Sequence, residues 1–83
     1  MYRFAITSRR IYERRQQLGY SLRQLAARSG VPRSSLSRYE RGETLPTGKR
    51  LARIARALNT TTAYLAFEGK ALPMGPVYLE FEA

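Results

Sequence analysis

Two short helical patterns, over residues 22–29 and 33–41, meet at Gly30, and this pairing constrains the fold of the 83-residue chain more than any other feature. Glycine adopts at little cost the left-handed backbone conformation that ends a helix. Val31 and Pro32 then restart the chain, because proline fixes its own φ and biases the preceding residue towards extended geometry, as at a first helical turn. The sequence therefore predicts two short helices joined by a tight turn.

The first helical pattern has both an apolar stripe and a start signal. Leu22, Leu25 and Ala26 are spaced i, i+3, i+4, which places them on one side of a helix. Ser21 precedes the pattern and Gln24 follows three residues later, as in the S-x-x-Q capping box that satisfies free amide donors at a helix start. We therefore expect Ser21 to cap this helix.

The second pattern separates an apolar side from a polar side. Leu36 and Tyr39 are the residues expected to be buried, and Gly42 is expected to close the helix. The residues expected on the outer side are Arg33, Ser34, Ser37, Arg38 and Arg41. This outer side is the part of the helix pair that remains free to contact a partner.

A further helix is predicted before this pair, over residues 9–18, with Thr7 or Ser8 as its cap and Gly19 at its end. One side of this helix carries Ile11, Arg15 and Leu18. Four tyrosines fall at or beside helical core positions, and a place in the core is predicted for Tyr12, Tyr20, Tyr39 and Tyr64.

Two more helices are predicted after the pair. Thr47 is the expected cap of the first of them, and Asn59 ends it. Its apolar residues recur at i, i+3, i+4 and i+7, the clearest amphipathic pattern of the chain, and are Leu51, Ile54, Ala55 and Leu58. Thr61 is the expected cap of a short fifth helix over residues 62–68, ended by Gly69. Five helices with short connections predict a compact all-α fold.

The two ends of the chain have a different pattern. Residues 77–82 alternate apolar and polar side chains with period two, as in a half-buried strand, and residues 2–6 alternate weakly in the same sense. One interpretation pairs these two segments, a second pairs the tail with the tail of another copy, and a third leaves the tail without regular structure. We expect a helical domain over residues 1–70 and a tail over residues 71–83.

The chain is strongly basic, with a net charge of +9 from 15 Lys and Arg residues against 6 acidic residues. Glu80 and Glu82 lie in the tail, so residues 1–70 hold all 15 cations against four carboxylates, a net charge of about +11. A domain this basic favours a polyanionic partner, of which nucleic acid is the commonest, over a soluble protein that is merely basic. Most of the cations are Arg, whose forked guanidinium binds phosphate and guanine edges, although a GC-rich genome also favours Arg codons.

The missing residue types exclude several classes of function. The chain has no Cys, no His and no Asp, so it has no disulfide, no thiolate zinc site, no cysteine nucleophile and no histidine general base. We therefore expect no metal, no cofactor and no enzymatic activity. There is no run of roughly 18 apolar residues and no apolar core of a signal peptide, so we expect a cytoplasmic protein without a membrane segment.

A set of spacings along residues 8–69 goes beyond any single motif. It comprises Arg15 before Gly19, Leu25-Ala26, Gly30-Val31, the run from Leu36 to Gly42, Pro46, Leu51, Ile54, Ala55, Leu58 and Tyr64-Leu65. This pattern resembles the lambda-repressor/Cro-type helix-turn-helix domains, the family often called XRE-like. The resemblance implies a five-helix DNA-binding domain in which the second and third helices form the helix-turn-helix.

The resemblance implies that the helix over residues 33–41 enters the major groove of DNA with its N-terminal half against the base edges. Carried over by position, the base-reading residues are Arg33, Ser34, Ser37 and Arg38. The two arginines have the reach and the fork to bind guanine O6 and N7, while for Arg38 a phosphate contact is the alternative. The serines are short enough to bind a base, a phosphate or a water molecule.

The resemblance also implies phosphate contacts from the start of the helix over residues 22–29, where free amides and the positive end of the helix dipole face the DNA backbone. Relatives often carry Gln where this chain has Leu22, so one side-chain contact is lost here. The implied phosphate-contacting residues are Ser21, Arg23, Arg41, Thr44, Thr47 and Lys49. For Arg41 a solvated charge is the alternative, and a solvated face is expected for Arg53 and Arg56.

The resemblance implies a structural role for one further pair of residues. Arg15 and Glu40 are expected to form a partly buried ion pair that ties the first helix to the end of the third and so holds the reading helix in place. A dimerisation surface is expected on the fifth helix or on the tail. The candidate dimerisation residues are Tyr64, Phe67, Val77, Leu79 and Phe81.

The expected function is sequence-specific binding to double-stranded DNA by a homodimer that reads an inverted repeat, as in a repressor of the phage or prophage type. One alternative is the antitoxin of a toxin–antitoxin operon, which would bind a toxin as well as DNA. The other two alternatives are a controller of a restriction–modification system and a non-specific architectural DNA binder.

Overall fold

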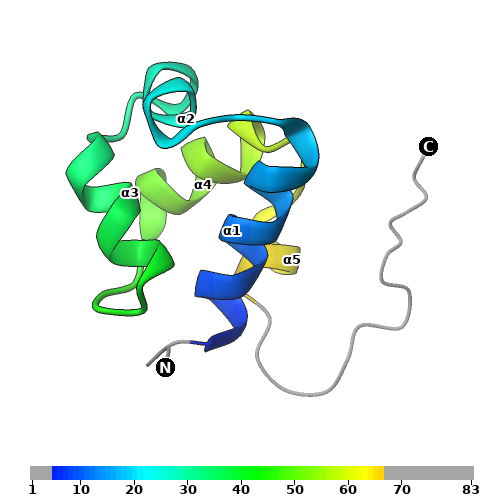
Figure 1. The fold of residues 1–83 in the computed structure, drawn as a ribbon. Coiled ribbons are helices and arrows are strands. Elements are labelled where there is room, and N and C mark those ends of the chain that lie inside the picture. Colours follow the sequence, from blue (N-terminus) through cyan, green and yellow to red (C-terminus); the bar gives the residue numbers. More distant parts are fainter. Residues whose placement is uncertain (1–4, 67–83) are drawn as a thin grey trace.

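The computed structural model describes residues 5–66 of the chain, and all regular structure in this range is helical. The helices, in the order shown in Figure 1, are α1 (Ala5–Leu18), α2 (Leu22–Ser29), α3 (Arg33–Glu40), α4 (Gly48–Ala57) and α5 (Thr62–Ala66). None of these helices has both the length and the apolar character needed to cross a membrane. The predicted all-α fold is confirmed, and the strand predicted over residues 77–82 lies outside the described residues.

The helix pair forms as its local sequence predicts. α2 has the predicted bounds, and its capping box is complete: the Ser21 Oγ accepts from the Gln24 amide at 3.0 Å, and the Gln24 side chain accepts from the Ser21 amide at 2.8 Å. Gly30 has a φ of +74°, in the left-handed region, and its amide donates to the Ala26 carbonyl at 2.9 Å. The turn between α2 and α3 therefore favours glycine at this position.

α1 begins before its predicted start, so Thr7 and Ser8 lie inside the helix and the prediction that they cap it is wrong. The strand pattern over residues 2–6 is also wrong for Ala5 and Ile6, which are helical. Thr7 is 3% exposed and Ser8 is 1% exposed. Ile11 follows Thr7 by one helical turn, so the two residues lie on the same side of the helix. Burial of this side against the core favours helix beyond the residues that the local sequence marks as caps.

Both ends of α4 and the start of α5 agree with the prediction in position but not in every contact, and the predicted end of α5 at Gly69 lies outside the described residues. Thr47 is the N-terminal cap residue of α4, yet its side chain makes no capping hydrogen bond, contrary to the prediction. The reason is that the Arg50 amide, the usual donor to such a side chain, donates to the Thr47 carbonyl at 3.1 Å instead. Asn59 follows α4 with a φ of 58°, and the Thr61 Oγ1 accepts from the Tyr64 amide at 3.0 Å, which confirms the predicted cap of α5.

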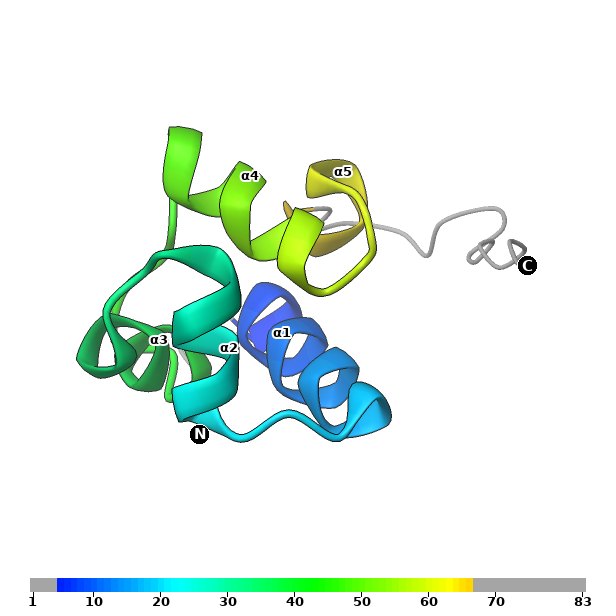
Figure 2. The ribbon, with the colours of Figure 1, turned by 90° about the horizontal axis from the view of Figure 1, so that it is seen from above.

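The five helices pack in a closed ring around one core (Figure 2). α1 packs against α3 and α5, α2 packs against α3 and α4, and α4 packs against α5. The core consists of Ile11, Leu25, Val31, Leu36, Tyr39, Ile54, Ala55, Leu58 and Leu65. Each fully buried Leu or Ile side chain contributes about 1.5–3 kcal/mol of hydrophobic stabilisation. Because Val31 comes from the turn, the core also holds the connection between α2 and α3.

The predicted core role of the tyrosines is found for three of the four. Tyr39 is buried, and Tyr20 and Tyr64 are partly buried against the core. Tyr12 is 42% exposed, so its predicted core role is wrong. Consecutive residues point about 100° apart around a helix, so burial of Ile11 turns Tyr12 away from the core.

Two arginines of α1 hold this helix against the end of α4 and against α5. The Arg10 Nη1 donates to the Tyr64 carbonyl at 2.6 Å, and the Arg14 Nε donates to the Leu58 carbonyl at 2.9 Å. Leu58 caps the C-terminus of α4, so Arg14 is a cation at the negative end of that helix dipole. Both arginines therefore already have partners inside the domain.

Candidate nucleic-acid interface

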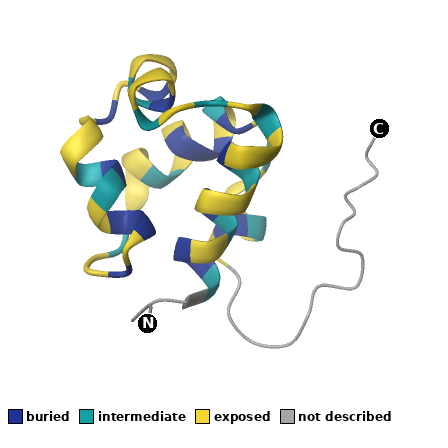
Figure 3. Cartoon of the chain, viewed as in Figure 1, coloured by how far each residue is buried: buried dark blue, intermediate teal, exposed yellow. Residues whose placement is uncertain are grey.

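The outer side of α3 carries the four residues predicted to read bases. Arg33, Ser34 and Arg38 are exposed and Ser37 is half-buried. Leu36, on the inner side of the helix, is fully buried, in keeping with the division between exposed and buried sides in Figure 3. The four predicted residues form one stripe, because residues three and four apart are neighbours on a helix surface.

The start of α3 leaves backbone donors free. Its cap residue, Pro32, makes no side-chain hydrogen bond to the helix, and its carbonyl accepts from the Leu36 amide at 3.1 Å. The amides of residues 33–35 have no acceptor within an α-helix that begins here. Together with the positive end of the helix dipole, they favour a negatively charged or acceptor group in front of the helix.

Arg15 and Glu40 form the predicted ion pair between α1 and α3. The Arg15 Nε and Nη2 donate to the two Glu40 carboxylate oxygens at 2.7 and 2.9 Å, and each side chain is only 9% exposed. The remaining nitrogen, Nη1, donates to the Tyr20 carbonyl at 2.7 Å. The hydrogen bond to Glu40 raises the pKa of the Arg15 guanidinium, although burial acts in the opposite direction. One side chain thus joins α1, the α1–α2 connection and the last residue of α3.

The start of α2 is less open than predicted. The amide and hydroxyl of Ser21 both take part in the capping box with Gln24, so Ser21 offers no free amide to a phosphate. The amides of Leu22 and Arg23 have no acceptor within the helix. The Arg23 side chain is exposed and has no partner among residues 5–66. Arg23 and these two amides are therefore the donors that α2 offers.

The turn after α3 engages both arginines at that end of the helix. The Glu43 Oε2 accepts from the Arg41 Nε at 2.8 Å, and the Glu43 Oε1 lies 3.8 Å from the Arg38 Nε. The Arg41 Nη1 donates to the Ser37 Oγ. The hydrogen bond from Arg41 lowers the pKa of Glu43, and the same bond raises the pKa of Arg41. Three of the residues predicted to contact DNA are therefore joined in one cluster with Glu43.

Arg50 brings the start of α4 to α3. Its Nη1 donates to the Ser35 Oγ at 3.1 Å and to the Tyr39 hydroxyl at 3.2 Å. Because Ser35 and Arg50 are each the third residue of their helix, this contact links the first turn of α4 to the first turn of α3. The predicted phosphate-contacting residues in this region, all exposed, are Thr44, Thr47 and Lys49.

The cations of residues 5–66 divide into those with a partner inside the domain and those without one. The first group includes Arg28, which lies over the Tyr20 ring, and also Arg38, Arg41 and Arg50. Each arginine of α1 has a bonding partner inside the domain; these are Arg9, Arg10, Arg14 and Arg15. The cations with no ion pair, hydrogen bond or ring contact within the described part of the chain are Arg23, Arg33, Lys49, Arg53 and Arg56. The first three occupy the first or second position of α2, α3 and α4. At the starts of these three helices, an unpaired cation therefore lies beside unpaired helix amides, whereas Arg53 and Arg56 lie further along α4.

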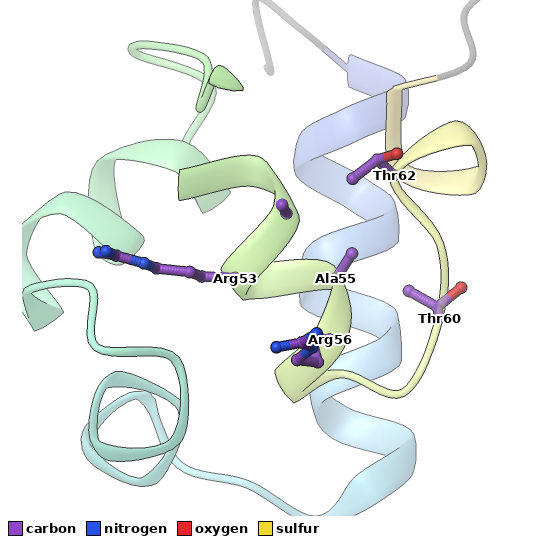
Figure 4. A pocket seen from close by; sticks show the side chains of 6 residues that line it. Arg53, Ala55, Arg56, Thr60 and Thr62 are labelled. Carbon is purple, nitrogen blue, oxygen red and sulfur yellow. The ribbon is translucent and has the colours of Figure 1, made fainter. Parts of the chain in front are cut away.

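A pocket of about 400 Å³ lies beside the second half of α4 and the segment that leads into α5 (Figure 4). Its lining residues are Ala52, Arg53, Ala55, Arg56, Thr60 and Thr62. It contains no carboxylate and no residue predicted to contact DNA. Arg53 and Arg56, for which a solvated face was expected, are exposed here.

The partners of Arg10, Arg14 and Arg50 were not predicted from the sequence. These contacts join residues far apart in the chain, for which no local pattern exists. The position of Glu43 was also missed, although a local signal was present. Gly42, which closes α3 with a φ of +76°, is typical of a helix end whose backbone brings the following residue back over the helix.

The helix-turn-helix family model matches residues 11–65, which is more than half of the chain and extends from α1 to α5. The matched segment includes the whole α2–α3 pair and both members of the Arg15–Glu40 ion pair. No curated protein and no solved structure gives a significant match. The matched family consists of DNA-binding regulatory domains and is not a family of enzymes. The chain therefore belongs to the Cro/CI-type helix-turn-helix family of sequence-specific DNA-binding transcriptional regulators.

Proposed function

We propose that two copies of the chain bind an inverted-repeat operator in double-stranded DNA, and that the protein is a repressor of the phage or prophage type. The observation that carries this proposal is the division of the cations. The arginines of α1 are engaged inside the domain, while Arg23, Arg33 and Lys49 are unpaired at the starts of α2, α3 and α4. A cation beside unpaired helix amides is a combination that binds backbone phosphates and base acceptors.

α3 is the proposed reading helix, with its N-terminal half in the major groove. Arg33 is its first residue, and its guanidinium has no partner within residues 5–66 that would compete with the O6 and N7 atoms of a guanine. Ser34, Ser37 and Arg38 complete the proposed base-reading stripe. A good bidentate contact of this kind discriminates against a wrong base by about 1–3 kcal/mol.

The DNA backbone is proposed to be held by residues that flank α3 in the sequence. Arg23 and the first amides of α2 form one group of donors, and Arg41, Thr44, Thr47 and Lys49 form the other. Ser21 supports the first group as the cap of α2, since its amide and hydroxyl are both engaged. These contacts position the helix and supply affinity, but they carry no sequence information themselves.

A dimer would place its two copies of α3 about 34–36 Å apart, one turn of DNA, which requires a two-fold-symmetric operator. Among the candidate dimerisation residues, Tyr64 is half-buried, and the Arg10 guanidinium lies 4.4 Å from the centre of its ring. The other candidates, Phe67, Val77, Leu79 and Phe81, lie outside the described residues. A dimer bound over a promoter in the cytoplasm would prevent RNA polymerase from binding there.

Selection of bound duplexes from a random library, at near-physiological salt, tests this proposal. Enrichment of a two-fold-symmetric site, with two copies of the chain on the selected duplex in sedimentation, is the expected result. Binding that enriches no motif and falls steeply with salt would identify a non-specific architectural binder instead. A chain without residues 73–83 separates the two dimerisation surfaces, because loss of the two-copy complex would assign dimerisation to the tail.

A further inference from the structure

The backbone at the end of α3 places Glu43 directly over the last turn of the helix. The amides of Arg41, Gly42 and Glu43 donate to the carbonyls of Ser37, Tyr39 and Arg38, at 3.0, 3.1 and 3.0 Å. The left-handed conformation of Gly42, with a φ of +76°, makes this reversal of the chain. The position of Glu43 therefore follows from the way the helix ends.

At this position the Glu43 carboxylate lies against the guanidinium groups of two arginines. It accepts a hydrogen bond from the Arg41 Nε at 2.8 Å and lies 3.8 Å from the Arg38 Nε, while the Arg41 Nη1 donates to Ser37. The bond from Arg41 holds the pKa of Glu43 below its ordinary value, so Glu43 is charged at neutral pH. All three charged side chains are at least half exposed: Arg38 is 60%, Arg41 56% and Glu43 50% exposed. An anion in solution can therefore reach them.

We propose that Glu43 is a built-in competitor for DNA phosphate: it holds Arg41, and to a lesser degree Arg38, and thereby weakens the grip of the α3 surface on the DNA backbone. The inference rests on the proposed function in taking this side of α3 as the surface that meets DNA. Arg33 and Ser34, at the other end of the helix, make no contact with Glu43 and are unaffected by it.

The size of the effect follows from counterion release. Each phosphate that a protein neutralises on duplex DNA steepens the dependence of log affinity on log salt by about 0.9. A variant that makes one additional phosphate contact therefore loses about 3.5-fold more affinity than the wild type when the salt concentration rises from 50 to 200 mM. A regulator meets non-operator DNA in very large excess, so a lower affinity for the backbone leaves more of the protein free to find its site.

Binding of random-sequence duplexes by Glu43→Gln and Glu13→Gln, from 50 to 200 mM salt, tests this inference. Glu13 is a matched control, because it is also 50% exposed and also accepts a hydrogen bond from the Nε of one arginine, Arg9, at 3.2 Å, but it lies on α1. Glu43→Gln should bind more tightly than the wild type. The ratio of the two affinities should fall by about 3.5-fold as the salt concentration rises from 50 to 200 mM. Equal effects of the two substitutions would overturn the inference.

A second pair of variants separates release of Arg41 from simple repulsion between Glu43 and DNA. In a chain that carries Arg41→Gln, the additional change Glu43→Gln should raise the affinity for random-sequence duplexes by less than half as much as it does in the wild type. An undiminished gain would show that Glu43 acts only by repulsion, and would overturn the inference. These measurements need no operator, so they remain distinct from the proposed function, which fails if the wild type prefers no sequence.

Discussion

Replacing Arg15 by alanine is expected to destabilise the domain more than replacing any exposed cation. The substitution removes two hydrogen bonds to Glu40, at 2.7 and 2.9 Å, and one to the Tyr20 carbonyl, at 2.7 Å. It leaves the Glu40 side chain, only 9% exposed, as an unpaired carboxylate between α1 and α3. The cost is therefore mainly that of a charge that has lost both its partner and most of its contact with water.

Removing one partner of a buried ion pair costs about 3–5 kcal/mol. A domain of this length has a free energy of unfolding of about 4–12 kcal/mol, at 0.05–0.15 kcal/mol per residue. A loss of about 3 kcal/mol would lower the Tm by about 12–24 °C, at 4–8 °C for each kcal/mol. Arg15→Ala is therefore expected to remove about a quarter or more of the free energy of unfolding.

Urea and thermal denaturation followed by circular dichroism measure this loss. Arg9→Ala is the matched control, because it breaks an exposed ion pair of the same helix and should cost less than about 1 kcal/mol. The double substitution Arg15→Met with Glu40→Leu should be less destabilising than Arg15→Ala alone, because no buried charge is left unpaired. An Arg15→Ala domain within about 1 kcal/mol of the wild type, or a double variant worse than the single one, would refute this reasoning.

Three further predictions concern single positions. Ser21→Ala removes the side-chain half of the α2 capping box and should lower the free energy of unfolding by about 1 kcal/mol in urea denaturation. Gly30→Ala meets no atom within 4 Å, so its cost in the same assay should be the left-handed strain alone, about 1–2 kcal/mol. The pKa of Glu43 should lie below the ordinary range of Glu in an NMR titration and should rise in Arg41→Gln, because the Arg41 hydrogen bond is the main cause of the lowered pKa. Since the folded-state pKa of Glu43 is lowered, its contribution to stability is present above the ordinary Glu range and is lost as the pH falls through the lowered value.

Local patterns in the sequence were enough to predict the helix-turn-helix. The bounds of α2, its capping box and the left-handed turn at Gly30 depend on residues that are neighbours in the chain, so their signals can be read from a short segment. The cap predicted at Thr7 or Ser8 failed because burial against the core extends α1 beyond these residues. Local capping signals predict a helix start only where tertiary packing does not favour a longer helix.

The contacts that organise the candidate site could be predicted only in part. The Arg15–Glu40 pair followed from the resemblance to a family and not from any spacing, since the two residues are 25 positions apart. The contacts of Arg10 and Arg14 with carbonyls of the last two helices depend on how the helices pack, and no pattern in the sequence signals them. Such contacts decide which of the many arginines are left for DNA.

Duplex selection with Arg33→Ala beside Arg56→Ala tests most directly whether α3 reads bases. Both substitutions remove one exposed arginine that has no partner among the described residues, one from the start of α3 and the other from the end of α4. Arg33→Ala should select the wild-type site but lose about 1–3 kcal/mol of base discrimination at one position in each half-site. Arg56→Ala should retain the base preference at every position. If Arg33→Ala weakened binding equally for all sequences and relaxed no position, Arg33 would be a phosphate contact, and the proposed base-reading role of α3 would be contradicted.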